Sequence, residues 1–266
     1  MSCPEYAAYR TAIAGLLCKG QCSHWTERVE HITDPFRNRI LAALDDAGRE
    51  RLLPHLEFVE MKLDDVIHRF DEVPEHAWFP VDGLISLLCV MKDGASAEVS
   101  ITGNDGMLGV GLFMSGRSSP GQAVVQAAGS AWRVHGSVLK DEFRRNEHLR
   151  DVLLCYTQGL MMQMAQTAIC NRYHSVEQQF CRWLLISLDR LPTNRLLMTH
   201  GLISEMLGVR RESVTEASGT LQRLGAIRNT RGRIEVLDRP QLEQLACECY
   251  SIVSTATASL YTACGF

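Results

Sequence analysis

The spacing of hydrophobic residues changes twice along the chain of 266 residues. From Leu56 to Val138, apolar positions recur with a period of two, and turns such as Asp82-Gly83 and Asp93-Gly94 divide them. Alternation of this kind is typical of short strands in a β-barrel or sandwich. On either side the period is helical. Residues 38–53 predict an amphipathic helical hairpin, and residues 139–191 predict long helices that end before Pro192.

Two further helices and a basic hairpin are predicted between residues 198 and 237. A turn that contains Gly208 separates the helices, and each helix has one apolar face. Helix, turn, helix and hairpin in this order are typical of a winged helix-turn-helix, whose second helix enters the major groove of DNA. The second helix begins with side chains that can bond base edges and phosphates: Arg210, Arg211, Glu212, Ser213, Thr215 and Glu216.

These segments resemble the Crp/Fnr superfamily of bacterial transcription factors, which includes the cyclic-AMP receptor protein. The strongest match is GVRRESVTEASGTLQRLGAI, because Arg211-Glu212-Ser213-Val214 corresponds to the family's Arg-Glu-Thr-Val at the start of the recognition helix. The hairpin RNTRGRIEVLD, the segment HSVEQQFCRWLL and the strand region FPVDGLISLLCVMKDGASAEVSITGNDGMLGV also resemble family segments. The resemblance covers about residues 38–245. Glu216 departs from the family, whose best-known members have an Arg there.

The resemblance implies an α+β fold with a β-roll sensor similar to a cyclic-nucleotide-binding domain, a long dimerisation helix and a C-terminal winged helix-turn-helix. The parts expected are an N-terminal helical extension that contains cysteines (1–37), the β-roll (38–138), the dimerisation helix (139–173), the DNA-binding domain (174–245) and a C-terminal tail (246–266). The residues expected to contact DNA are Thr199, His200, Arg210, Arg211, Glu212, Ser213, Thr215, Glu216, Arg231 and Arg233.

The expected function is that of a homodimeric transcription regulator that binds double-stranded DNA and, as the resemblance implies, contacts RNA polymerase. A stripe at Leu149, Leu153, Tyr156 and Leu160 has nearly coiled-coil spacing and predicts the dimer seam. Packing of this stripe on the chain's own β-roll is the alternative. A different class of function is a signalling adaptor, in which the helix-turn-helix docks a protein instead of DNA.

Charge is distributed unevenly along the chain. The formal net charge is −4, but residues 195–239 carry eight Arg and five acidic residues, which leaves this segment at +3 and the rest of the chain at −7. A basic C-terminal module on an acidic body indicates that only one end of the molecule touches phosphate. The charge therefore favours DNA binding over the adaptor.

The family's cyclic-nucleotide pocket is degenerate in this sequence. Family members that bind a cyclic nucleotide hold its ribose with Glu and its phosphate with an Arg-Ser pair, and these positions align with Gly109 and with Gly121-Gln122. A buried phosphate needs a charged partner, and these aligned positions carry no charged side chain. We therefore expect an effector other than cyclic AMP, and the cofactor is unknown. The candidate pocket residues are Gly109, Val110, Arg117, Gln122 and Tyr156.

The ten cysteines suggest a second kind of sensor. No apolar run reaches the ~20 residues of a membrane span and no export signal is recognisable, so we expect a cytoplasmic protein whose cysteines are thiols or metal ligands. Cys18, Cys22 and His24 could bind zinc or an iron–sulfur cluster, which would make the protein a metal- or redox-responsive regulator; thiols on a helical arm are the alternative. Cys247 and Cys249 are ambiguous, and Cys155, Cys170 and Cys181 are expected in the core. No nucleophile and base are paired, so we do not expect an enzyme.

Overall fold

The computed structural model describes residues 33–114, 116 and 121–265. The predicted helical stretch of the N-terminal extension, with Cys18, Cys22 and His24, lies outside the described residues, and so does Arg117. None of the described helices is long and apolar enough to cross a membrane.

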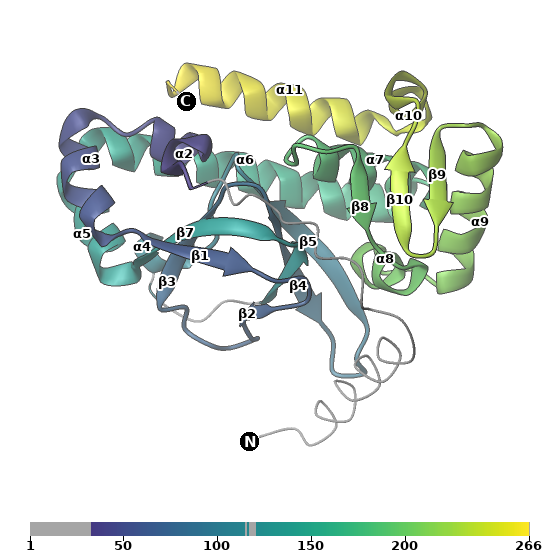
Figure 1. Cartoon of the computed structure of the whole chain (residues 1–266), viewed down its shortest axis with the longest axis horizontal. Coiled ribbons are helices and arrows are strands. Elements are labelled where there is room, and N and C mark those ends of the chain that lie inside the picture. The colour runs from purple at the N-terminus through teal and green to yellow at the C-terminus, as the bar shows by residue number, and fades with distance from the viewer. Residues whose placement is uncertain (1–32, 115, 117–120, 266) are drawn as a thin grey trace. The chain divides into compact units, whose positions relative to one another are not determined.

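The region of period two forms two antiparallel sheets, as predicted (Figure 1). One sheet has the order β1-β7-β3, with strands β1 (Glu57–Met61), β7 (Gly129–His135) and β3 (His76–Pro80). The other has the order β2-β6-β4-β5, with strands β2 (Val66–His68), β6 (Gln122–Ala127), β4 (Leu84–Val90) and β5 (Ser96–Thr102). Buried side chains from both sheets pack together, among them Met61, Ile85, Val125 and Ala131. Alternate positions of these strands therefore face a shared core, as their sequence pattern requires.

Short helices precede the sheets and cover one end of them. They are η1 (Pro35–Arg37), α2 (Arg39–Ala42), α3 (Asp46–Leu52) and η2 (Leu53–His55), and α4 (Gly111–Met114) follows β5. Asn38 caps α2 by accepting from the backbone N–H of Ile40, and its amide donates to the carbonyls of Pro80 and Gly106 at 3.0 and 2.8 Å. The predicted hairpin at 38–53 is confirmed as these short helices.

The helical region 139–191 consists of three helices. They are α5 (Gly136–Arg145), α6 (Glu147–Tyr173) and α7 (Val176–Leu188). The first break is at Asn146, whose side chain accepts from the N–H of Leu149 at 3.0 Å and donates to Asp45 at 2.9 Å. At the second break, Ser175 and Gln178 form a capping box at the start of α7. The helix caps therefore divide this region into separate helices, although the helical spacing of its hydrophobic residues continues without a break.

The long helix α6 has three faces with different surroundings. Leu149, Leu153 and Tyr156 are buried in a core that includes Phe79 of β3 and Met107. Because Leu153 and Tyr156 are only 0% and 4% exposed inside their own chain, the predicted dimer seam through them is wrong. The second face meets the C-terminal helix described next. The third face is exposed and carries Leu154 (48%) and Met161 (64%).

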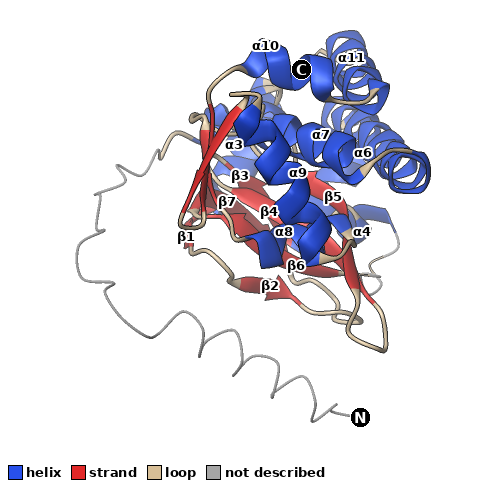
Figure 2. Cartoon of the chain, turned by 90° about the vertical axis from the view of Figure 1, so that its right-hand side faces the viewer, coloured by secondary structure: helices blue, strands red, loops and turns tan. Residues whose placement is uncertain are grey.

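The predicted C-terminal tail is a 16-residue helix, α11 (Glu248–Ala263), that lies alongside α6 (Figures 1 and 2). Gly159 of α6 faces the ring of Tyr261. Cys155 of α6 and Cys264 at the end of α11 form a disulfide. This pair departs from the expectation that the cysteines are thiols or ligands.

The C-terminal domain joins helices to a small sheet of order β8-β10-β9. Its elements are β8 (Arg195–Leu197), α8 (His200–Leu207), α9 (Arg211–Arg223), β9 (Ile227–Thr230), β10 (Arg233–Val236) and α10 (Arg239–Leu245). Phe180 and Leu184 of α7 share one buried cluster with Ile203 and Val214 of this domain and with Ile101 of β5. The domain therefore packs on the second sheet without a gap in the core.

Three direct contacts join the domain to strand β5 and the loop that follows it. The hydroxyl of Ser96 at the start of β5 donates to the backbone carbonyl of Glu205 in α8 at 3.5 Å, and Ala97 packs against the turn at Gly208. At the other end of β5, the half-buried Arg190 forms an ion pair with Asp105 at 2.8 Å.

Candidate nucleic-acid interface

Helices α8 and α9 form the predicted helix-turn-helix (Figure 2). Helix α8 ends at Gly208, whose φ of 65° and ψ of 34° are left-handed. Glycine adopts this conformation without the steric cost that a Cβ adds, and it commonly ends helices in this way. The glycine seen in the sequence therefore sets the sharp turn between the two helices.

Helix α9 has a buried face and an exposed one. Val214, Ala217 and Leu221 are buried in the cluster shared with α7 and α8. The opposite face exposes most of the predicted DNA-contacting residues of this helix, and Ser213 is half-buried at its edge; the exposed ones are Arg210, Arg211, Glu212, Thr215 and Glu216. The hydrophobic spacing thus fixes which side of the helix faces solvent.

The first turn of α9 also offers backbone donors. Arg210 is the N-cap, and its side chain forms no capping hydrogen bond. The N–H of Ser213 donates to the carbonyl of Arg210 at 3.1 Å, so the N–H groups of Arg211 and Glu212 are the ones left without a partner among the described residues. Open N–H groups at a helix N-terminus, together with the helix dipole, favour an anion such as a phosphate. Thr199, by contrast, uses its hydroxyl to cap α8 by accepting from the N–H of Leu202 at 3.2 Å.

His200 connects both helices to the hairpin. Its Nδ1 lies 3.0 Å from the hydroxyl of Thr215 in α9, and its Nε2 contacts the side-chain amide of Asn229 in β9. Asn229 also donates to the hydroxyl of Ser218 at 3.1 Å. Burial, and then the charge of Arg211, lower the pKa of His200, which favours a neutral ring that can accept a hydrogen bond. Both ring nitrogens are engaged inside the chain, so His200 orients α9 against the hairpin. Asn229 and Ser218 were not anticipated from the sequence.

The β9–β10 hairpin has a two-residue tip, Arg231-Gly232. Its φ angles are 49° and 80°, which is the geometry of a type I′ turn. Arg231 is exposed at the tip, and Arg233 begins β10 half-buried. Glu235 pairs with both Arg228 (3.1 Å) and Arg195 (3.0 Å). These two arginines are therefore partly neutralised, which the net charge of the segment did not reveal.

Within the part of the chain that the structure describes, Arg210, Arg211 and Arg231 are among the arginines of this domain that form no ion pair with a local counter-charge. Two stand at the start of α9 and one at the hairpin tip, so a surface that runs from the recognition helix to the wing keeps its positive charge. Glu212 and Glu216 are the exposed acidic side chains on the same helix.

The region that aligns with the family's nucleotide pocket is closely packed. Gly109 has a φ of +108°, and a Cβ there would lie 3.2 Å from the Cα of Ala77. A Cβ at Gly121 would lie 2.8 Å from the carbonyl oxygen of Leu88. Neither position has room for a longer side chain unless the backbone moves.

The other described members of the predicted effector pocket are partly or fully buried. Gln122 is buried on β6, and Val110 is half-buried beside α4. The hydroxyl of Tyr156 donates to the carbonyl of Met107 at 2.8 Å, and burial raises the pKa of this tyrosine to about 12. Tyr156 is thus a core residue.

Comparisons with known proteins agree with this architecture. Residues 178–245 match the family model of the Crp-like helix-turn-helix domain. FixK2 from Bradyrhizobium japonicum has a similar structure, with 19% identity, a TM-score of 0.61, and coverage of 72% of this chain and 98% of FixK2. A CRP/FNR-family transcriptional regulator from Thermus thermophilus has 22% identity, a TM-score of 0.58, and coverage of 71% of this chain and 98% of that regulator.

The c-di-GMP-responsive global regulator CLP of Xanthomonas campestris is also similar, with 13% identity, a TM-score of 0.59, and coverage of 73% of this chain and 100% of CLP. No curated protein sequence matches the chain. The predicted β-roll, long helix and helix-turn-helix are therefore confirmed. The chain carries a Crp-like helix-turn-helix domain, and its described part has the fold of Crp/Fnr transcriptional regulators.

Proposed function

We propose that the protein is a dimeric regulator of transcription that binds specific sequences in double-stranded DNA. One observation carries the proposal: the start of α9 presents Arg210 and Arg211, whose guanidinium groups form no ion pair among the described residues, on a helix whose other face is buried. Arg211 would bond a guanine and Glu212 would accept from a cytosine in the major groove. Ser213, Glu216 and the methyl group of Thr215, whose hydroxyl already bonds inside the chain, would face neighbouring bases. Arg210, Arg231, Arg233 and the backbone at the start of α9 would hold phosphates.

His200 and Thr199 have a supporting role in this proposal. His200 fixes the angle between α9 and the wing through Thr215 and Asn229, and Thr199 caps α8. They are positioning residues, because their polar side-chain atoms already have partners inside the chain. We place the protein in the cytoplasm, where it would contact RNA polymerase beside its DNA site, and we assign it no catalysis.

The dimer would form through the exposed face of α6. Leu154, Gln158, Met161, Ala165 and Ala168 are exposed there and follow the alternating spacing of three and four that a two-helix seam requires. The occupant is a second copy of this chain, because a two-fold axis along α6 lets two α9 helices reach successive major grooves. This seam lies on the side of α6 opposite Leu153 and Tyr156, which face the β-roll.

The effector of this regulator would not be cyclic AMP. The close packing around Gly109 and Gly121 leaves no place for the acidic and basic side chains that a cyclic nucleotide needs. Addition of cyclic AMP should therefore leave the melting temperature unchanged. A ligand that binds only the folded protein stabilises it by roughly 2.7 kcal/mol at a hundredfold excess over its dissociation constant. Differential scanning fluorimetry with cyclic AMP and with c-di-GMP checks this, and a saturable rise with cyclic AMP would contradict it.

Replacement of Arg211 by Ala should weaken binding to the preferred duplex by about 1–3 kcal/mol and relax the choice of base at one position. The preferred duplex is first selected from a randomised DNA library with the full-length protein. Arg231→Ala should instead weaken binding to all duplexes alike and reduce the salt dependence of binding by about one phosphate contact. Affinity is measured by fluorescence anisotropy over a range of salt concentrations.

Arg144→Ala on α5 is the matched control, because it removes an exposed arginine far from α9 in the sequence. Equal affinity and base preference in the wild type and Arg211→Ala would refute the assigned role of α9. If library selection enriches no sequence and binding to duplex DNA is independent of salt, the helix-turn-helix serves as a protein-docking surface instead.

A further inference from the structure

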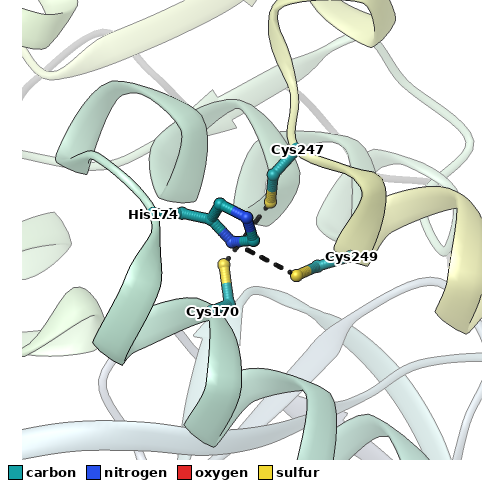
Figure 3. A group of neighbouring side chains, drawn as sticks. All are labelled: Cys170, His174, Cys247 and Cys249. Atoms are coloured by element: carbon teal, nitrogen blue, oxygen red, sulfur yellow. Dashed lines mark hydrogen bonds between the residues drawn. The ribbon is translucent and has the colours of Figure 1, made fainter.

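Three cysteines and a histidine from distant parts of the sequence meet where α6 ends and α11 begins (Figure 3). Cys170 lies in the last turn of α6 and His174 is its C-cap, whereas Cys247 is the N-cap of α11 and Cys249 lies in its first turn. Their sulfur and imidazole nitrogen atoms all lie within 4.8 Å of one another. Cys170, Cys247 and Cys249 are buried and form a cluster of their own.

The distances suit one metal ion at the centre of the four side chains. The sulfurs of Cys170 and Cys247 are 3.5 Å apart, and the sulfur of Cys249 is 3.4 Å from Nδ1 of His174. A tetrahedral Zn²⁺ with Zn–S bonds of about 2.3 Å holds its ligand atoms about 3.8 Å apart. An iron–sulfur cluster places several iron and sulfide atoms between its ligands and therefore needs a wider site.

The local chain geometry explains how the four ligands converge. Cys170 and His174 are four residues apart, so the helix places them on the same side. Cys247 and Cys249 flank the first residue of α11, where the chain turns into the helix. Glu248 stands between them in the sequence, and its carboxylate lies 3.3 Å from Nε2 of His174.

Residues around the four ligands are arranged as at protein metal sites. A metal-bound histidine commonly directs its second nitrogen at a carboxylate, which fixes the ring and makes it a better ligand; His174 has Nδ1 toward the sulfurs and Nε2 toward Glu248. The amide of Gln166 donates to the sulfur of Cys249 at 3.0 Å. The buried guanidinium of Arg182 acts electrostatically on Cys170 and would offset the negative charge that three thiolates leave on Zn²⁺.

We propose that Cys170, His174, Cys247 and Cys249 bind one Zn²⁺ in a closed tetrahedral site. Four protein ligands leave no position for substrate, so the ion is structural. It would attach the start of α11 to the end of α6 and thereby hold the helix-turn-helix domain, which lies between them in the sequence, against the long helix. Cys170 is therefore more than the core residue expected from the sequence, and the ambiguous Cys247 and Cys249 gain a role.

The test measures metal directly in the full-length protein, independently of DNA binding. After chelation and incubation with excess Zn²⁺ and gel filtration, mass spectrometry of metals should find one tightly held zinc per chain in addition to any bound elsewhere. With Co²⁺ in its place, the absorption spectrum should show tetrahedral ligand-field bands and thiolate charge transfer. Cys249→Ser and His174→Ala should each remove this ion or weaken its affinity strongly, and Cys89→Ser on β4 should retain it.

Glu248→Gln keeps all four ligands and is the variant least at risk of unfolding. It should keep the cobalt spectrum but weaken metal affinity by about 10- to 100-fold, as changes next to metal-bound histidines do. A cobalt spectrum without thiolate bands, or a zinc content that Cys170→Ser and Cys247→Ser together leave unchanged, would overturn the proposal. Zinc held only by Cys18, Cys22 and His24 would give that second result. Visible absorption of anaerobically purified protein from an iron–sulfur cluster, lost in Cys249→Ser, would overturn the choice of zinc.

Discussion

Aspartate at both Leu154 and Met161 should convert the protein into monomers that bind a palindromic duplex at least ~100-fold more weakly. Both side chains are exposed on the free face of α6, at 48% and 64%, and they are seven residues apart. Four carboxylates would then meet at the seam of the dimer without partners, and burial of an unpaired charge is strongly unfavourable. A monomer also loses the second half-site, and linked binding sites typically gain 10²- to 10⁴-fold in avidity.

Sedimentation equilibrium measures the change in mass, and anisotropy measures the loss of DNA affinity. Aspartate at Phe70 and Met91 provides a matched control, because these side chains are also exposed and apolar, at 61% and 67%, but lie on the β-roll. The control protein should remain dimeric. A double variant at 154 and 161 that still sediments as a dimer would show that the chains associate through another surface.

In the wild-type protein, ionisation of Glu98 should lower the free energy of unfolding as pH rises. The variant Glu98→Gln should not show this decrease. Glu98 lies on β5, buried where the second sheet meets α7, and accepts a hydrogen bond from Ser86 at 2.6 Å. Burial raises the pKa of this carboxyl from 4.5 to about 7, although Ser86, Arg182 and Arg190 favour the charged form. The folded protein therefore keeps the proton in a range of pH where the unfolded chain has lost it.

The sign of the effect follows from proton binding. Between pH 4.5 and about 7 the folded state binds more protons at Glu98 than the unfolded state, so the free energy of unfolding falls as pH rises. One pKa unit corresponds to 1.36 kcal/mol, so the loss is on the order of 3 kcal/mol. Glutamine cannot ionise, and the variant should gain about this amount relative to wild type between pH 4.5 and 8.

Urea denaturation of both proteins across this range checks the prediction, with Glu50→Gln on α3 as the exposed control. Other groups titrate in both proteins, so the informative quantity is the difference in free energy of unfolding between variant and wild type. A difference that stays constant from pH 4.5 to 8 would mean that Glu98 is not held protonated by burial.

The parts of the fold that were predictable are those in which local pattern and tertiary packing agree. Hydrophobic and polar residues alternate along the strands of the β-roll because both sheets share one core, and Gly208 marks the turn between α8 and α9 because a left-handed residue is needed there.

The dimer seam was misplaced for a physical reason. A stripe buried against the chain's own sheets and a stripe that pairs with a second helix have similar spacing, and Leu153 and Tyr156 belong to the first kind. The exposed stripe contains Gln158, Ala165 and Ala168, so its hydrophobic signal is weak.

The proposed zinc site could not be predicted from the sequence as one site. Cys170 and Cys247 are 77 residues apart, and only the packing of α11 along α6 brings them together. Each half of the site is a recognisable pair in the sequence: Cys170 and His174 are four residues apart, and Cys247 and Cys249 are separated by one residue. The cysteines near the N-terminus formed the more obvious pattern because they are close in sequence, which is a poor guide when a fold joins distant helices.

The contact between β5 and the helix-turn-helix has a thermodynamic consequence. Ser96 and Ala97 touch α8 and the turn at Gly208, and Asp105 holds Arg190 just beyond the other end of β5. A ligand that displaces β5 when it binds the β-roll thus changes the free energy with which α9 binds the major groove of DNA. Because linkage is reciprocal, DNA must alter the affinity for that ligand by the same factor. An unknown effector should therefore bind the protein–DNA complex and the free protein with different affinities. A comparison of ligand binding to the two forms can be used to search for it.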